Sequence, residues 1–329
     1  MVVPAQGELA AECRRDDIPV FVVPMPVAGW LRKEFRTGIR RLREIIRVTD
    51  AAVLHADSAL AMRYAGWAGR LEGRRVIWHV RTHVSEGLSD RLLSSLAHRI
   101  VVNSKLVASR FPFVRKDRLL CIYSGVDLDG FPPPSFAARD AVRRRLGIPL
   151  NVPLVLSVGR LAPGSGYGAL LDAIGQVTAA RADVHWVIVE GGEERAVVEA
   201  RCRELGLHER VHLIGPGESM PEVLAACDVF VAPSLHDVFG RVLVEAMSMR
   251  KAVVAPKSGG APEIVVPGET GLLVPLGDVT ALAHGISNLL ANPNLAEYFG
   301  HNGRSRVEHQ FTLTRHVETV SGVYDALVA

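Results

Sequence analysis

Short runs of aliphatic and β-branched residues alternate with amphipathic stretches along the chain. In the second half, the apolar runs predict strands at residues 154–158, 185–189, 211–213, 228–232, 252–255 and 271–274. The amphipathic stretches predict helices near residues 168–181, 193–205, 220–226, 240–249 and 279–290. Such strand–helix alternation favours a parallel α/β sheet.

The first half shows the same alternation, with strands predicted at residues 20–23, 52–55, 76–80, 99–102 and 119–123. Between the halves, a charged helix predicted at 137–146 ends at Gly147 and Pro149, and Pro153 precedes a new apolar strand. Helix stop signals followed by a strand start are typical of a linker. We therefore predict two Rossmann-like domains facing a cleft, with the boundary near residues 147–153.

Composition narrows the function classes. The chain has 329 residues, of which 48% are hydrophobic and 22% charged, as in globular proteins rather than disordered ones. Only 6% are aromatic and the net charge of +3 is spread along the chain, which argues against nucleic acid as a partner. No apolar run reaches the roughly 18 residues of a membrane span, and the start lacks the pattern of a signal peptide.

The four cysteines, Cys13, Cys121, Cys202 and Cys227, form no CxxC pair, which argues against a zinc site or a disulfide framework. Cysteines used in this way indicate a reducing compartment, and we expect a cytoplasmic protein.

A glycine-rich turn follows the predicted strand at 154–158. It contains Gly159, Arg160, Gly164, Ser165 and Gly166, and a helix follows. Such a turn presents free backbone N–H groups at a helix N-terminus, where anions bind, and Arg160 adds a bidentate phosphate donor. The alternative is an ordinary strand–helix turn with a solvated arginine.

A second group of candidate residues follows the predicted strand at 228–232. Asp237 lies in the loop, and Glu245 lies eight residues later, about a turn and a half inside the next helix. Both carboxylates can face one site, with the helix amides of residues 240–242 between them. This arrangement suits a nucleotide-sugar; the alternative is that Asp237 caps the helix and Glu245 is solvated.

These motifs resemble those of the retaining glycosyltransferases of family 4, which have the GT-B fold of two Rossmann-like domains. The resemblance includes the loop Gly259–Glu263 and the stretch Thr270–Pro275, and it covers nearly all of residues 150–329. It implies an acceptor-side domain at residues 1–147 and a donor-binding domain at 148–310. A C-terminal helix within 311–329, bearing Tyr324, would return to the first domain.

The resemblance implies that a nucleotide-diphosphate-sugar is the donor. Arg160 would bind the diphosphate, Asp237 the sugar hydroxyls and Glu245 the ribose. The other donor-binding positions that it implies are Gly159, Ser165, Leu213, Gly215, Val238, Phe239, Gly240, Arg241 and Val242.

Catalysis is expected to involve His79, Arg160 and Asp237. His79 matches the family's active-site histidine at the end of a first-domain strand, and the alternative is a structural histidine. The resemblance implies retention of anomeric configuration without a metal or another cofactor. It also implies a carbohydrate, lipid-linked or natural-product acceptor.

The sequence departs from the family at Ser165, where the family has a diphosphate-binding lysine. Arg241 and Lys257 are nearby in sequence and are candidates to supply the missing charge. The loss of a charge-assisted bond supports a second hypothesis, a non-catalytic nucleotide-sugar-binding paralogue. A third hypothesis, a GT-B-type sugar epimerase, is weaker because the turn at Gly159 and the Asp237–Glu245 pair together favour transfer.

The N-terminus departs further from the family. Residues 1–7 resemble the end of the family's second strand, so the first strand, its glycine-rich loop and the first helix are expected to be missing. Our hypothesis is a start codon assigned too late, and the rival is a true truncation.

Residues 30–47 predict a basic amphipathic helix. It is a candidate for peripheral contact with an anionic membrane, but packing of its apolar face on the sheet is the favoured interpretation.

Overall fold

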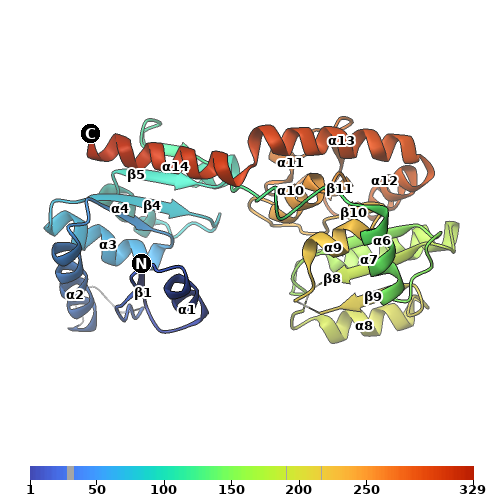
Figure 1. Cartoon of the computed structure of the whole chain (residues 1–329), viewed down its shortest axis with the longest axis horizontal. Coiled ribbons are helices and arrows are strands. Elements are labelled where there is room, and N and C mark those ends of the chain that lie inside the picture. The colour runs from blue at the N-terminus through green and yellow to red at the C-terminus, as the bar shows by residue number, and fades with distance from the viewer. Residues whose placement is uncertain (28–32, 190, 216) are drawn as a thin grey trace. The chain divides into compact units, whose positions relative to one another are not determined.

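The computed structural model describes residues 1–27, 33–189, 191–215 and 217–329. The chain forms two compact units (Figure 1). Unit 1 comprises Met1–Ile122 and Glu318–Ala329, and unit 2 comprises Tyr123–Val317. The chain therefore passes from one unit to the other twice.

Unit 2 is built on a six-stranded parallel sheet with the strand order β12-β11-β10-β7-β8-β9. Its strands are β7 (Leu154–Val158), β8 (His185–Val189), β9 (Val211–Ile214), β10 (Val229–Val231), β11 (Ala252–Pro256) and β12 (Gly271–Val274). Its helices are α6 (Phe136–Arg145), α7 (Tyr167–Ala180), α8 (Arg195–Glu204), α9 (Met220–Ala226), α10 (Arg241–Ser248), α11 (Ala261–Ile264), α12 (Val279–Ala291) and α13 (Pro293–Gln310). The strand order reverses between β7 and β10, which makes this a doubly wound sheet with its switch point there.

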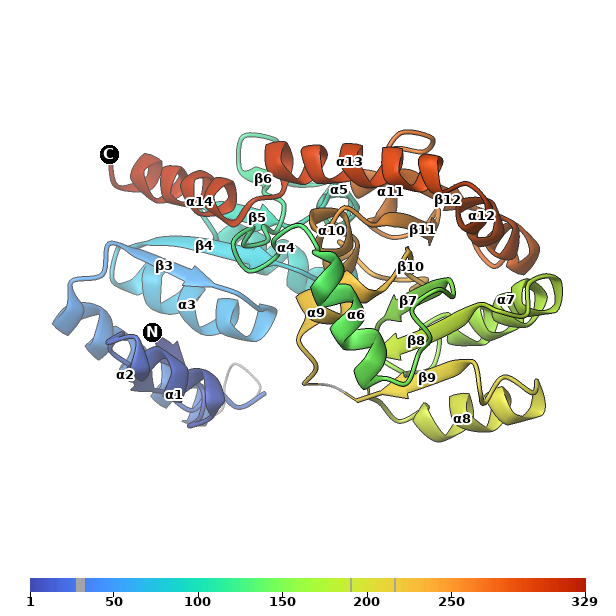
Figure 2. The ribbon, with the colours of Figure 1, turned by 45° about the vertical axis from the view of Figure 1, so that its right-hand side comes forward.

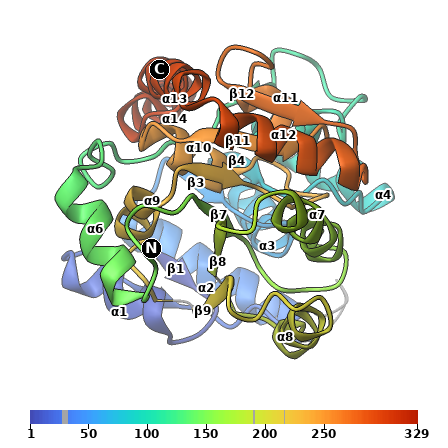
Figure 3. The ribbon, with the colours of Figure 1, turned by 90° about the vertical axis from the view of Figure 1, so that its right-hand side faces the viewer.

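Both faces of this sheet are covered, and its strands accordingly read as nearly continuous apolar runs rather than as an alternation of apolar and polar residues. Leu154, Leu156 and Val158 of β7 point to the layer that contains α9 and α10. Val155 points to the opposite layer, formed mainly by α7, α8 and α12 (Figure 3). The predicted parallel α/β sheet of the second half is confirmed, with strand ends within one residue of the predicted ones.

Unit 1 contains two parallel sheets in the described residues, a four-stranded sheet with the order β3-β4-β5-β6 and a separate β1-β2 pair. The strands are β1 (Val2–Val3), β2 (Phe21–Val22), β3 (Val53–Ala56), β4 (Arg75–Val80), β5 (Arg99–Val102) and β6 (Leu119–Cys121). The helices are α1 (Glu8–Arg15), α2 (Lys33–Thr49), α3 (Ala59–Leu71), α4 (Leu88–Leu96) and α5 (Lys105–Ala108), as Figure 2 shows. The hypothesis of a missing N-terminal strand and helix remains a prediction.

The last helix, α14 (Leu313–Val328), begins in unit 2 and ends in unit 1. Its Val323 and Leu327 are buried with Ile77, Val101 and Ile122 on one face of the four-stranded sheet. A segment far away in the sequence thus completes the core of unit 1.

The division between the units falls earlier than the predicted boundary near residues 147–153. Helix α6 packs on α9 and belongs to unit 2. Its Arg143 is fully buried and donates hydrogen bonds to the carbonyls of Ala226 and Val152 at 2.9 and 2.6 Å. The Gly147 and Pro149 stop signals therefore mark the end of a helix inside unit 2 and not a linker between the units.

The predicted basic helix corresponds to α2, and residues 30–32 lie outside the described residues. Phe35, Leu42 and Ile46 are buried, and the Phe35 ring lies 4.8 Å from the ring of Tyr64 on α3. The apolar face of α2 is therefore used for packing within unit 1. In the described part of the chain, no helix combines the length and the apolar character needed to cross a bilayer.

Candidate functional site

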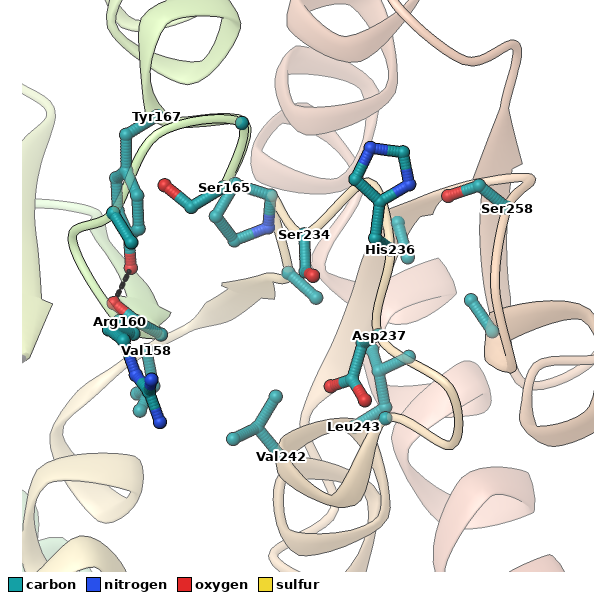
Figure 4. A pocket seen from close by; sticks show the side chains of 18 of the residues that line it. Val158, Arg160, Ser165, Tyr167, Ser234, His236, Asp237, Val242, Leu243 and Ser258 are labelled. Carbon is teal, nitrogen blue, oxygen red and sulfur yellow. Dashed lines mark hydrogen bonds between the residues drawn. The ribbon is translucent and has the colours of Figure 1, made fainter. Parts of the chain in front are cut away.

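A cavity of about 470 Å³ lies in unit 2 where the turns after β7, β10 and β11 meet. The turn after β7 contributes most of its residues between Gly159 and Ser165, and the loop after β10 contributes Pro233, Ser234, His236, Asp237 and Gly240 (Figure 4). β7 and β10 are the two strands at which the order of the sheet reverses. Open α/β sheets bind ligands at this position, beyond the carboxyl ends of the strands.

Gly166 lets the two loops that form the cavity approach each other. Its φ of +88° lies in the left-handed region, and a Cβ added there would lie 2.0 Å from the carbonyl oxygen of Pro233. Only glycine tolerates both the positive φ and the close approach of this carbonyl. Helix α7 begins at the next residue, so its N-terminus starts beside the cavity.

Arg160 and Ser165 both line the cavity, as predicted from the glycine-rich turn. Arg160 is exposed, and it is the only arginine or lysine among the described residues of the lining. The turn is fixed at its base, because the hydroxyl of Tyr167 donates to the carbonyl of Gly159 at 2.8 Å (Figure 4).

Asp237 lines the cavity from the loop before α10. Its carboxylate accepts a hydrogen bond from the amide of Phe239 at 3.2 Å, and its carbonyl accepts one from Gly260 at 2.8 Å. Gly259 has a φ of +57°, and a Cβ there would lie 2.1 Å from the carbonyl oxygen of Asp237. The Gly259–Gly260 pair is therefore the support on which the Asp237 loop rests.

Glu245 lies on α10 and is buried, with 8% of its surface exposed. Its carboxylate accepts a hydrogen bond from Nε of Arg241 at 2.8 Å. Burial raises the pKa of Glu245, and the charge and the hydrogen bond of Arg241 oppose this.

The structure brings only part of the predicted donor-binding set to the cavity. Gly159, Arg160, Ser165, Asp237, Gly240 and Val242 line it. The lining does not include Leu213, Gly215, Val238, Phe239, Arg241 or Glu245. Phe239 instead packs in the core, 5.9 Å from the ring of Tyr123.

Arg241 and Lys257 were candidates to replace the family lysine. Arg241 forms an ion pair with Glu245, and neither of the two lines the cavity. The charge missing at Ser165 is therefore not supplied by either residue in this structure.

Sequence reasoning gave no role to His236, Ser234 or Ser258, which also line the cavity (Figure 4). In the described structure, the buried hydroxyl oxygens of Ser165 and Ser258 have no hydrogen-bond partner. Ser258 follows β11, so its position at the carboxyl end of a strand next to the switch point could have indicated it.

His79 lies in unit 1, near the end of β4, and is only 2% exposed. Its Nδ1 lies 3.2 Å from Nε2 of His55 on β3, and Nδ1 of His55 lies 2.5 Å from the hydroxyl of Tyr324 on α14. His79 thus belongs to a polar row between the sheet and α14. A role beside the transferred sugar remains a prediction, and His55 was missed because nothing in the sequence links it to Tyr324.

Within the described ranges, no group of three or more His, Cys, Asp or Glu side chains is placed to hold a metal ion. The four cysteines are free thiols.

Two parallel α/β units, one of them doubly wound with a cavity at its switch point, define the class of GT-B glycosyltransferases. A glycosyltransferase from Rickettsia africae has a TM-score of 0.89 at 19% identity, over 98% of this chain and 88% of that one. Anabaena HepE in complex with UDP and glucose has a TM-score of 0.84 at 24% identity, over 98% and 90%.

The chain belongs to the family described as glycosyl transferases group 1, whose model matches residues 138–306. A second model, glycosyltransferase family 4, matches residues 1–130. The chain is 32% identical over 289 residues to a GDP-mannose-dependent phosphatidylinositol monomannoside mannosyltransferase of Mycolicibacterium smegmatis, covering 82% of this chain and 75% of that enzyme. It is 30% identical to α-maltose-1-phosphate synthase of the same species, a match that covers 66% of this chain but only 59% of that enzyme.

Proposed function

We propose that this chain is a retaining glycosyltransferase. It moves a sugar from a nucleotide-diphosphate-sugar to a carbohydrate, lipid-linked or natural-product acceptor, without a metal ion. The observation that carries the proposal is the switch-point cavity, which combines Arg160, the N-terminus of α7 and the carboxylate of Asp237. The names of curated relatives support it, because they include mannosyl- and kanosaminyltransferases.

The leaving group of this reaction is a nucleoside diphosphate, on which negative charge develops. Arg160 and the first amides of α7 and α10 would donate hydrogen bonds to that charge from the cavity wall. Asp237 would accept hydrogen bonds from the sugar hydroxyls. Glu245 would bind the ribose after Arg241 releases its carboxylate.

Retention is proposed to follow a front-face route. The acceptor hydroxyl attacks the anomeric carbon on the side from which the diphosphate leaves, through an oxocarbenium-like state. The departing diphosphate takes the acceptor proton, so the protein needs no covalent nucleophile. Arg160 stabilises the diphosphate in that state more than in the intact donor, and this difference lowers the barrier.

A non-catalytic nucleotide-sugar-binding protein is the second candidate. The observation that favours it is the low charge of the cavity. Ser165 provides a neutral hydroxyl, and Arg160 is the one arginine or lysine in the described lining. Charge-assisted hydrogen bonds are about twice as strong as neutral ones, so the leaving group would be stabilised less well.

Thermal-shift titration with UDP, GDP and ADP tests the donor site first. A diphosphate at about 100 times its Kd stabilises the folded state by about 2.7 kcal/mol. We expect a clear rise in Tm with one of the three. Cooperative melting with no rise for any of them would contradict both candidates. Donor hydrolysis without acceptor then separates them, because a pure binder releases no sugar.

Replacing Arg160 with alanine is expected to weaken diphosphate binding about tenfold or more, and to lower turnover with it, because a charge-assisted phosphate contact is lost. The matched control is Arg203→Ala, an exposed arginine on α8 outside the cavity, which should leave both values unchanged. Equal binding by the two variants would remove Arg160 from the site.

Replacing Ser165 with lysine is expected to act in the opposite direction. The new ammonium group would restore a cation to the cavity wall, and diphosphate affinity should rise about tenfold. If the chain is an enzyme, kcat for donor hydrolysis should rise as well. Tighter binding without any hydrolysis in either protein would favour the non-catalytic candidate.

Peripheral contact with a membrane remains a separate alternative. Because the apolar face of α2 is buried, only its exposed basic face could make that contact. Co-sedimentation with anionic liposomes at low salt tests it, and no binding would exclude it.

A further inference from the structure

A second cavity, of about 480 Å³, lies in unit 1 at the end of the sheet where β4 and β5 begin. Four arginines from four segments line it. Arg70 lies at the end of α3, Arg74 in the turn before β4, Arg99 at the start of β5 and Arg118 just before β6. The described lining contains no aspartate or glutamate.

The backbone fixes two of these arginines. Gly73 has a φ of +65° and ends α3, so that the amide of Arg74 bonds back to the carbonyl of Gly69 at 2.8 Å. Arg118 donates to the carbonyl of Ser94 at 2.6 Å and also to that of Ala97, at the end of α4. These contacts fix the backbone at Arg74 and the guanidinium of Arg118 at the cavity wall.

The positive charge of this cavity is poorly balanced. Of the four arginines, only Arg74 forms an ion pair in the described structure, with Asp50 at 2.7 Å, and Asp50 is 85% exposed. Arg70, Arg99 and Arg118 form no ion pair in the part of the chain described, although the charge of Arg99 contributes to lowering the pKa of Asp117. Like charges around one cavity repel each other, and a bound anion would offset that repulsion.

His98 adds a donor to the same wall. Its Nδ1 accepts the amide of Val76 at 3.1 Å, so the neutral ring carries its proton on Nε2. Burial lowers the pKa of His98, and the charges of Arg75, Arg118 and Arg99 lower it further. The ring is thus kept as a neutral N–H donor, and the side chains of the cavity wall offer donors and no carboxylate acceptor.

Structural roles account for three of the four arginines separately, because Arg74 pairs with Asp50, and Arg70 and Arg118 lie at the C-terminal ends of α3 and α4. Cations near the C-terminus of a helix interact favourably with its dipole, and Arg118 does this for α4. Arg99 donates only to the carbonyl of the adjacent His98. These separate contacts do not explain why four arginines from four segments face one cavity whose described lining contains no carboxylate.

We propose that this cavity binds a phosphate-type oxyanion, a phosphate or diphosphate group on a small molecule in solution. Guanidinium groups match phosphate oxygens with paired donors, which a halide cannot use. The donor cavity lies wholly within unit 2, so this anion site is a separate one and does not depend on the proposed function.

The test is isothermal titration of the full chain with inorganic pyrophosphate. All proteins carry Arg160→Ala, which weakens the donor cavity for the same probe. Arg99→Gln and, separately, the exposed Arg70→Gln should each weaken binding about tenfold. The matched control is Arg40→Gln, an exposed arginine of α2 outside the cavity, which should bind as the parent does.

Equal pyrophosphate affinity in all four proteins, or no binding by the parent, would overturn the proposal. Co-sedimentation with phosphatidylglycerol vesicles distinguishes the source of the phosphate. Vesicle binding that requires Arg99 while pyrophosphate does not bind would assign the site to a lipid headgroup and overturn the proposal of a soluble ligand. A cooperative melting curve for each variant shows that the fold is intact.

Discussion

In unit 2, backbone contacts at glycines hold the loops around the cavity, whereas in unit 1 side chains from distant segments hold the buried polar groups. Gly166 and Gly259 each allow two backbone segments to meet beside the switch-point cavity. In unit 1, Tyr324, His55 and His79 form a row across three elements, and Arg110 pairs with Asp90. The comparison teaches that local sequence motifs can predict a site that is shaped by the backbone. They cannot predict a network of side chains that come from distant segments.

The largest effect is expected from breaking the buried pair of unit 1. Asp90 and Arg110 are almost fully buried, and Asp90 accepts from Nε of Arg110 at 2.9 Å. Asp90→Asn should lower the free energy of unfolding by about 3–5 kcal/mol, because it leaves a buried guanidinium unpaired. Asp50→Asn, at an exposed pair with Arg74, should cost about 1 kcal/mol or less. Urea unfolding measures both, and equal losses would contradict the argument.

The same pair has a pH signature. Burial alone would raise the pKa of Asp90, but the hydrogen bonds from Arg110, the Glu86 amide and Ser85 outweigh it and hold the pKa below its ordinary value. Because the pKa of Asp90 is lower in the folded state, its ionised carboxylate stabilises the fold at any pH above the unfolded-state pKa, near 4. That stabilisation is lost as the pH falls through the folded-state pKa. In Asp90→Asn, that part of the acid-dependent loss should disappear.

Gly166→Ala tests the backbone side of the comparison. The substitution meets both a positive φ and the carbonyl of Pro233, and should cost about 1–3 kcal/mol and weaken diphosphate binding. Gly175→Ala, inside α7 with open space around it, is the matched control and should stabilise by about 0.5–1 kcal/mol. Similar Tm changes of the same sign in the two variants would show that the loop approach at Gly166 is unimportant.

The smallest effect on stability is expected from the hydrogen bond between His55 and Tyr324 of α14. His55→Gln and Tyr324→Phe each remove the hydrogen bond between these two side chains, and each should cost about 1 kcal/mol. Because both remove the same bond, the double variant should cost clearly less than the sum of the two, with a coupling of at least about 0.5 kcal/mol. Additive losses in urea unfolding would show that the two side chains act independently.

Most of the elements of unit 2 were predictable, because a strand buried on both faces is a short apolar run and each run ends at a turn. The loops around the switch-point cavity could be predicted for a related reason, since Gly166 and the Gly259–Gly260 pair are fixed by local geometry. The cavity wall formed by Ser258 and His236 was not found, because it depends on which strands are neighbours in the sheet.

The sequence misled about the boundary between the two units. Gly147 and Pro149 end a helix, but whether a linker follows depends on what that helix packs against, and α6 packs within unit 2. Glu245 has the predicted spacing from Asp237, and its carboxylate is bound by Arg241 outside the cavity lining, so its role toward a ribose stays a prediction. Spacing along a helix gives the face of a residue and not its partner.

The position of α14 also has a consequence for the order of events during synthesis. Domains generally fold as units while the ribosome makes them, with the N-terminal one first. Here the face of the unit 1 sheet that carries Ile77, Val101 and Ile122 is covered by Val323 and Leu327, which are translated after the whole of unit 2. Unit 2 is contiguous and can complete its core first. The unit made first is therefore the one that finishes folding last, and until then it exposes an apolar surface that chaperones would recognise.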